Sequence, residues 1–115
     1  MSKRLRRIII EELVNTYSGK GLAELLGVSP AAVSKYLSGV MHPSDKTMIR
    51  ALSLLKGEQK RKIYQMIVDE LANGLYKSVR EFHRYIEWSP SLSRTYNALE
   101  VLRKTSVIPI KRHIP

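Results

Sequence analysis

The sequence has 115 residues, of which 43% are hydrophobic and 26% charged, a composition typical of one globular domain or two very small ones. The absence of cysteine excludes disulfides and cysteine-based metal sites. No apolar run approaches the roughly 20 residues that a membrane-spanning helix needs, so we expect no membrane partner.

The net charge of +10 is shared by both halves of the chain. Residues 1–57 carry nine basic and four acidic side chains, and residues 58–115 carry eleven and six. A field of that sign attracts polyanions, of which nucleic acid is the commonest. Charge alone does not exclude a basic protein with no nucleic-acid role.

Residues 4 to 17 are predicted to form an amphipathic helix, because apolar residues from Leu5 to Tyr17 recur along one stripe. Ser18 and Gly19 are expected to end this helix. Four basic residues cluster at its beginning, where the helix dipole favours anions: Lys3, Arg4, Arg6 and Arg7. This cluster is either a site for an external anion such as phosphate or a solvated basic end.

The basic start is followed by an apolar run, which is the order found in a signal peptide. The apolar run is short, and Glu11 and Glu12 interrupt it. We therefore predict no signal peptide and a location in the cytoplasm or on the nucleoid.

Residues 21 to 39 are predicted to form two short helices joined by a tight turn. Gly27 stands just past the first helix, where a residue that can take a positive φ is favoured. Ser29 is expected to cap the second helix and Pro30 to begin it, because the missing proline N–H costs nothing there. Apolar residues are expected to face inward on both helices: Leu22, Leu25 and Leu26 on the first, and Val33, Tyr36 and Leu37 on the second.

The opposite face of the second helix carries small or cationic side chains. Small side chains let a helix sit deep in the major groove of DNA, and Lys35 can reach a phosphate or a guanine edge. The candidate residues for contact with base edges and nearby phosphates are Ser29, Ala31, Ala32, Ser34 and Lys35.

This stretch resembles the helix-turn-helix of the Cro and phage-repressor type over about residues 5 to 56. The resemblance rests on the placement of small, apolar and glycine residues: Ala23, Gly27, Val28, Val33 and Leu37-Ser38-Gly39. It implies binding to double-stranded DNA, usually as a two-fold homodimer whose half-sites lie roughly 34 Å apart. The family usually has glutamine where this chain has Gly19 and Lys20, so Lys20 is the candidate for that phosphate contact. The alternative is an ordinary helical hairpin with no partner.

Ser44 is predicted to cap a helix that runs to about Leu55, and Gly57 to end it in the left-handed conformation. Helix N-termini bind phosphate through free N–H groups and the helix dipole. Ser44 and Lys46 are therefore candidates for a clamp on the DNA backbone, as the resemblance also implies. Otherwise they only cap and solvate the helix.

A longer helix is predicted from Glu58 to about Asn73, with Asn73 and Gly74 as the stop signal. Apolar residues at spacing four follow this helix and fit either core packing or a dimer seam: Ile63, Ile67, Leu71 and Leu75.

Ser78 and Glu81 have the spacing of a capping box, which predicts a helix to about Glu87. This helix is expected to bury three apolar side chains: Val79, Phe82 and Ile86. Ser89 and Pro90 repeat the cap-plus-proline start of Ser29 and Pro30, and they predict a last helix to about Lys104. Beyond it, the β-branched run from Val107 to Ile110 could form a short edge strand.

The repeat of the cap-plus-proline start at a shift of 60 residues leaves two interpretations of the C-terminal part. Residues 78–108 weakly resemble a winged-helix-type helix-turn-helix, in which case Arg94 and Asn97 are candidates for DNA contact. A helical dimerisation region is the other interpretation.

The sequence therefore predicts an all-α protein, with a helix-turn-helix bundle in residues 1–57 and a second, smaller helical lobe in residues 58–115. The predicted function is sequence-specific binding of double-stranded DNA as a transcriptional regulator. Two alternatives stay open: a protein-interaction module such as an antitoxin, and a non-specific nucleoid or RNA-binding protein.

No sequence pattern indicates catalysis. His42, His83 and His113 lack metal-ligand spacing, and there is no glycine-rich phosphate loop and no nucleophile elbow. We therefore expect no enzyme activity, no metal, no cofactor and no small-molecule substrate.

Overall fold

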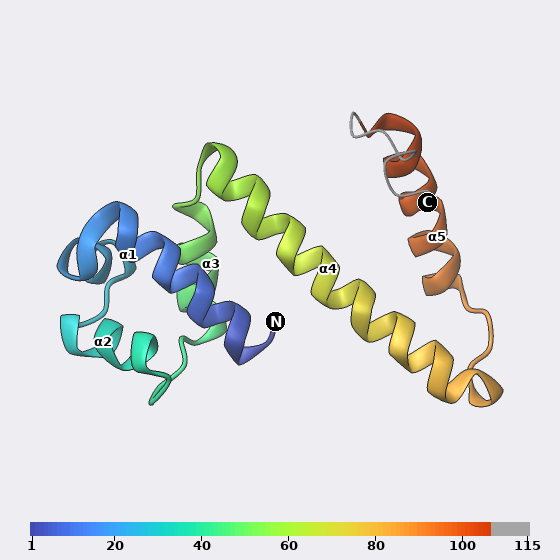
Figure 1. Cartoon of the computed structure of the whole chain (residues 1–115), viewed down its shortest axis with the longest axis horizontal. Coiled ribbons are helices and arrows are strands. Elements are labelled where there is room, and N and C mark those ends of the chain that lie inside the picture. The colour runs from blue at the N-terminus through green and yellow to red at the C-terminus, as the bar shows by residue number, and fades with distance from the viewer. Residues whose placement is uncertain (107–115) are drawn as a thin grey trace, which may run out of the picture. The chain divides into compact units, whose positions relative to one another are not determined.

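The computed structural model describes residues 1–106. Its elements are helical and follow in the order α1 (Lys3–Leu26), α2 (Pro30–Ser38), α3 (Asp45–Ser53), α4 (Gly57–Phe82), the 3-10 turn η1 (His83–Tyr85) and α5 (Pro90–Thr105) (Figure 1). No strand occurs among these described residues, so the predicted all-α class is confirmed. The edge strand predicted at Val107 to Ile110 lies outside the described residues.

Two compact units make up the chain, Met1–Tyr76 (unit 1) and Lys77–Pro115 (unit 2), and α4 crosses the boundary. Unit 1 extends beyond residue 57, after which the sequence divided the chain, because Ile63 of α4 is buried in its core. The assignment of residues 1–57 and 58–115 to separate domains stays a prediction. Across the described part of the chain, no helix combines the length and the apolar character that crossing a bilayer requires.

A kink at Ser18 divides α1 into two helical segments. Ser18 has φ 69° and ψ 166°, a conformation that few residues other than glycine adopt. Its hydroxyl accepts a hydrogen bond from the Gly21 N–H at 3.1 Å, which caps the second segment. The predicted end of the first helix at Ser18 is therefore confirmed.

The turn between α1 and α2 forms as the sequence predicts. Gly27 has φ 71°, and its N–H donates to the carbonyls of Ala23 and Glu24 at the end of α1. The Ser29 hydroxyl accepts from the Ala32 N–H at 3.0 Å, and Pro30 is the first residue of α2.

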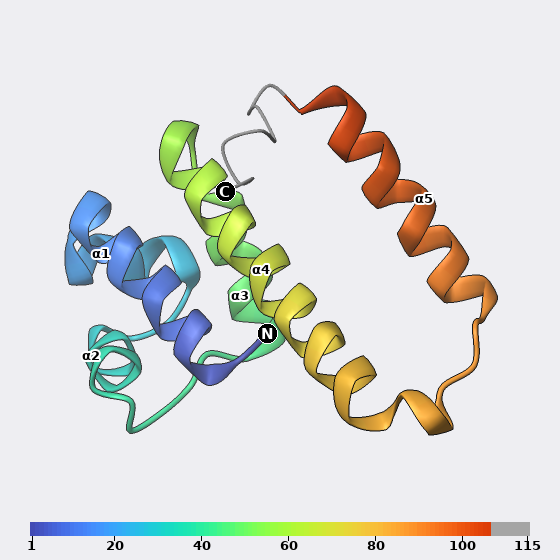
Figure 2. The ribbon, with the colours of Figure 1, turned by 45° about the vertical axis from the view of Figure 1, so that its right-hand side comes forward.

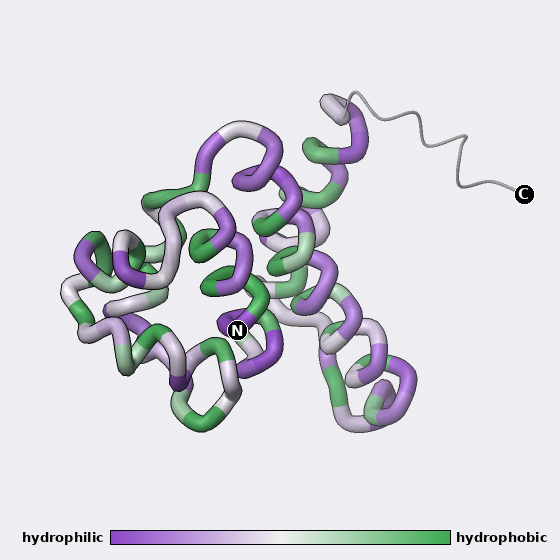
Figure 3. Tube along the Cα trace, turned by 60° about the vertical axis from the view of Figure 1, so that its left-hand side comes forward, coloured by the Kyte–Doolittle hydropathy of each residue, from purple (hydrophilic) through white to green (hydrophobic). Residues whose placement is uncertain are grey.

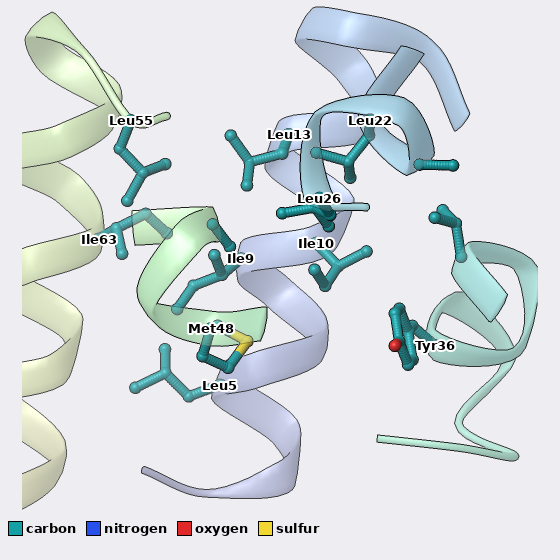
Figure 4. Packing of buried hydrophobic residues seen from close by; sticks show 13 residues of the cluster. Leu5, Ile9, Ile10, Leu13, Leu22, Leu26, Tyr36, Met48, Leu55 and Ile63 are labelled. Carbon is teal, nitrogen blue, oxygen red and sulfur yellow. The ribbon is translucent and has the colours of Figure 1, made fainter. Parts of the chain in front are cut away.

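The core of unit 1 is built around α1, against which both α2 and α3 pack (Figure 2). Figure 4 shows Tyr36 of α2 on one side of α1 and Ile63 of α4 on the other. All side chains of the core are apolar or aromatic: Leu5, Ile9, Ile10, Leu13, Leu22, Ala23, Leu26, Val33, Tyr36, Met48, Ala51, Leu55 and Ile63. Burial of each large aliphatic side chain stabilises the fold by about 1.5–3 kcal/mol before entropy is counted. Leu25 was expected to face inward, but it is 48% exposed and points away from this core.

Hydrogen bonds tie the first part of α4 to α1. The Lys62 ammonium lies 2.6 Å from a carboxylate oxygen of Glu12, and the Gln59 side chain donates to the Glu12 carbonyl at 3.1 Å. At the start of α1, Glu70 accepts hydrogen bonds from the Ser2 N–H, at 3.0 Å, and from the Ser2 hydroxyl. The bond from Lys62 lowers the pKa of Glu12, and the bonds from Ser2 lower the pKa of Glu70.

The boundary between α3 and α4 differs from the prediction. Ser44 caps α3, as expected, and α3 ends at Ser53, with Leu54 in the right-handed conformation. Gly57 has the expected positive φ, 57°, but it begins α4 and does not end α3.

The stop at Asn73 and Gly74 is wrong, because α4 continues to Phe82. A glycine inside a helix costs about 1 kcal/mol relative to alanine, which is too little to end a helix whose residues on both sides are favourable. Ser78 lies inside α4, so the helix predicted to start there is also wrong. The side chains expected to be buried in it are 41%, 51% and 39% exposed: Val79, Phe82 and Ile86.

Unit 2 contains the end of α4, η1 and α5. Ser89 caps α5 by accepting from the Leu92 N–H at 3.2 Å, and Pro90 begins the helix, as predicted. The Trp88 indole donates to the Ser93 hydroxyl at 2.6 Å, and its ring lies edge-on to Tyr96 at 6.2 Å between ring centroids. Because α4 runs through Ser78 without a break, the first helix of the suspected second helix-turn-helix does not form as a separate element.

The carboxylates that join α4 to α1 predict a loss of stability in acid. Their pKa is lowered in the folded chain, so the stabilisation is complete above the ordinary value of 4.5 and is lost as the pH falls through the lowered pKa. We expect the thermal midpoint, followed by circular dichroism, to decrease as the pH falls below about 4.5. Glu70→Gln should reduce this dependence on pH more than Glu24→Gln, which changes an exposed residue. Equal pH profiles of the two variants would contradict this role of Glu70.

Candidate nucleic-acid interface

The inner side of α2 holds it to the core, and the outer side is exposed. Val33 is 1% exposed and Tyr36 5% exposed, and both contact the core formed with α1. Most of the predicted base-facing residues are exposed: Ser29, Ala31, Ser34 and Lys35. Ala32 is half-buried, so it lies at the margin of the outer face.

The end of α2 is fixed by hydrogen bonds to the backbone carbonyl of Lys35. The Ser38 hydroxyl donates to this oxygen at 3.1 Å, and the Met41 N–H donates at 3.2 Å. Gly39 allows the reversal of the chain with φ 80°. The ammonium group of Lys35 pairs with no carboxylate among residues 1–106, and it is available to an external anion.

The predicted backbone-contact residues lie at two other helix starts. Lys20 is exposed two residues after Ser18, which caps the second segment of α1. Lys46 is exposed in the first turn of α3. The Ser44 hydroxyl accepts from the Thr47 N–H at 3.2 Å and lies 3.1 Å from the Thr47 hydroxyl. Its capping role is therefore confirmed, and its contact with phosphate stays a prediction.

A cationic pocket lies between the start of α1 and the loop after α2. It has a volume of about 230 Å³ and is lined by Lys3, Arg4 and Arg7 together with Gly39 and His42. A Cβ added to Gly39 would lie 3.6 Å from an Arg7 guanidinium nitrogen, which places this cation beside the end of α2. The pocket therefore adds positive charge beside the C-terminal end of α2.

Arg6, the fourth basic residue of this cluster, has a structural role. Its guanidinium donates to the Pro43 carbonyl at 2.8 Å and pairs with the Asp45 carboxylate. The hydrogen bond from Arg6 lowers the pKa of Asp45. Arg6 thus joins the start of α1 to the segment that enters α3, and it is not part of the pocket lining.

Arg50 of α3 holds the turn before α2. Its guanidinium donates to the Leu26 carbonyl at 3.0 Å, which satisfies one of the free carbonyls at the end of α1. A Cβ on Gly27 would lie 2.9 Å from the same guanidinium nitrogen. The turn that sets the direction of α2 is therefore fixed both by its backbone conformation and by α3.

The sequence showed the basic cluster at the start of α1 but not the residues that lie beside this cluster in the folded chain. In the sequence His42 showed only a lack of metal-ligand spacing, and the folded chain brings it and Gly39 beside the cluster. Arg94 and Asn97 are exposed on α5 in unit 2, where the Arg94 guanidinium donates to the Ser91 hydroxyl at 3.2 Å. Their contact with DNA stays a prediction.

The order of elements in unit 1 is that of a known DNA-binding unit. It runs from the second segment of α1 through the Gly27 turn to α2 and α3. The sequence model of the helix-turn-helix family matches residues 15–58. This segment is a helix-turn-helix of the Cro and phage-repressor type. The helix-turn-helix indicates a DNA-binding protein, with α2 in the place of the recognition helix. Comparisons with curated proteins and with solved structures gave no match.

The geometry of the helix-turn-helix predicts different effects of two glycine substitutions. Gly27→Ala should destabilise the fold by about 1–2 kcal/mol, because an L-residue is strained at positive φ. Gly19→Ala is the matched control, since it lies within α1 with no atom within 4 Å of the added Cβ, and it should be neutral or stabilising. Denaturant unfolding measures both changes, and a Gly27→Ala variant as stable as Gly19→Ala would contradict the strained turn.

Proposed function

We propose that the protein binds double-stranded DNA in a sequence-specific manner and regulates transcription, with α2 in the major groove. The observation that carries this proposal is the exposed, narrow and cationic outer face of α2 on a helix-turn-helix scaffold. A helix with small outer side chains can approach base edges closely. The protein would act on the nucleoid, in the cytoplasm.

The candidate DNA-binding residues are assigned two roles, contact with bases and contact with the DNA backbone. Lys35 is the side chain with the length and the donors to read a guanine edge, and the smaller residues of α2 let the helix approach. Base contacts from the helix and its cap are assigned to Ser29, Ala31, Ala32, Ser34 and Lys35. Backbone contacts, which fix the register without reading sequence, are assigned to Lys20, Ser44 and Lys46.

The cationic pocket supports a further backbone contact beside α2. Lys3, Arg4 and Arg7 bring three positive charges around a pocket of about 230 Å³, and Arg7 lies 3.7 Å from a carboxylate oxygen of Glu11. Cations gathered at the beginning of a helix repel its dipole, and a phosphate between them would relieve that repulsion. We therefore assign a DNA phosphate to this pocket.

Lys35→Ala tests the recognition helix. If Lys35 reads a base, the variant should lose about 1–3 kcal/mol of binding free energy and relax preference at one position of the site. The matched control is Lys56→Ala, which removes an exposed lysine outside the proposed surface. Selection of bound duplexes from a random pool, followed by titration of the enriched duplex, measures both effects. Unchanged affinity and preference in a folded Lys35→Ala variant would remove Lys35 from the interface.

Arg4→Ala and Arg7→Ala test the pocket. Each phosphate contact contributes a slope of about −0.9 to the dependence of log affinity on log salt, so each variant should flatten this slope by about that amount. Sequence preference should be unchanged, because phosphate contacts carry no base information. Arg61→Ala is the matched control, since its side chain is 81% exposed on α4. A slope equal to that of the control would show that the pocket does not contact DNA.

A further inference from the structure

Exposed aromatic side chains are concentrated in unit 2, around the start of α5. Four of the eight aromatic residues of the chain fall within residues 82–96, where they are 51–86% exposed: Phe82, Tyr85, Trp88 and Tyr96. In the core of unit 1, by contrast, Tyr36 is 5% exposed. Tryptophan is highly buried on average in folded proteins, so the 68% exposure of Trp88 marks this surface as a candidate binding site.

The ring of Trp88 is held in place by contacts within unit 2. Its indole N–H donates to the Ser93 hydroxyl at 2.6 Å, and its ring meets the Tyr96 ring at 69°, with the centroids 6.2 Å apart. The N–H is the one donor of this side chain, so the flat ring is what remains for a partner. Because these contacts already orient the ring, binding through it would lose little conformational entropy.

Positive charge accompanies these rings. The described residues of unit 2, 77–106, carry six basic and three acidic side chains. Arg84 directly precedes Tyr85, and Arg94 lies two residues before Tyr96. The Arg94 guanidinium donates to a serine hydroxyl, and neither arginine pairs with a carboxylate among residues 1–106. Hydrophilic and hydrophobic residues alternate along α5 in Figure 3, so polar and charged side chains are interleaved with apolar ones there.

Exposed rings together with arginines have the chemistry that binds single-stranded nucleic acid. Unpaired bases stack on aromatic side chains, while cations follow the phosphates and arginine adds its own stacking. Bases inside a duplex are stacked on one another, so they do not offer their faces to a protein ring. A purely apolar partner is disfavoured, because it would remove water from Arg84 and Arg94 without supplying negative charge.

We propose that unit 2 binds single-stranded nucleic acid, with an unpaired base stacked on Trp88. Tyr96 orients the Trp88 ring, Tyr85 offers a second ring, and Arg84 and Arg94 supply positive charge for the phosphates. The site lies wholly within unit 2, outside the helix-turn-helix, so it does not rest on the binding of duplex DNA by α2. It gives the protein a second kind of nucleic-acid contact, for a strand without its complement.

The fluorescence of the full chain tests this site directly, because Trp88 is its single tryptophan. Titration with oligodeoxythymidine of about 12 nucleotides should quench the emission as a base stacks on the ring. An abasic strand of the same length carries the phosphates without the bases, so it should leave the emission unchanged. Oligouridine of the same length distinguishes the two sources of the strand: stronger quenching by it assigns RNA to the site, and stronger quenching by oligodeoxythymidine assigns DNA.

Substitutions separate stacking from charge. Trp88→Leu should weaken the binding of dye-labelled oligodeoxythymidine, measured by fluorescence anisotropy, by about 5–150-fold. Trp88→Phe should restore most of this loss, because it keeps a ring on which a base can stack. Tyr64→Leu is the matched control, since it removes a 40% exposed ring of α4 outside this site, and it should bind as the unsubstituted chain does. Circular dichroism of each variant verifies that the helices are retained.

Several results would overturn the proposal. These are the absence of quenching by either strand, equal quenching by the abasic strand or by a duplex, and a Trp88→Leu variant that binds as tightly as Tyr64→Leu. A change of emission with phosphatidylserine vesicles but not with oligonucleotides would assign the surface to a membrane instead. Lys35→Ala should leave the quenching by single strands unchanged, so failure of duplex recognition by α2 is distinguishable from failure of this site.

Discussion

The packing of α2 against α1 through Val33 and Tyr36 is the constraint on which the rest of the structure depends. These two side chains bury one side of a nine-residue helix that is too short to be stable alone. Because that side is committed to the core, the small and cationic residues of α2 can only lie outside. The core thus determines which residues are available to DNA before any contact with DNA is considered.

Polar side chains then fix the direction of α2 and of its neighbours. Arg50 holds the end of α1 at the Gly27 turn, Arg6 joins the start of α1 to the entry of α3, and Glu70 joins that start to α4. A recognition helix must be held rigidly, since small errors in its orientation lose contacts to base edges. Arg6 shows that a basic cluster near a nucleic-acid surface can contain a residue with a structural role.

The two faces of α4 explain why its apolar pattern fitted two interpretations in the sequence. The stripe at spacing four predicted from Ile63 to Leu75 mixes residues of both faces: Ile63 is buried, and Leu71 and Leu75 are exposed. A helix that is apolar over a wide arc needs a partner on each side. The fold of one chain supplies the partner of the face that carries Ile63.

The sequence by itself determined the local elements: the Gly27 turn, the caps at Ser29, Ser44 and Ser89, the break at Ser18 and the helix-turn-helix that they form. These signals act over three or four residues, so local chemistry is enough to specify them. Only the tertiary structure decided the continuation of α4 through Gly74, the exposure of Leu25 and the meeting of Arg7 with Gly39 and His42. The reason is that burial and side-chain encounters depend on which surfaces meet, and residues distant in sequence make those surfaces.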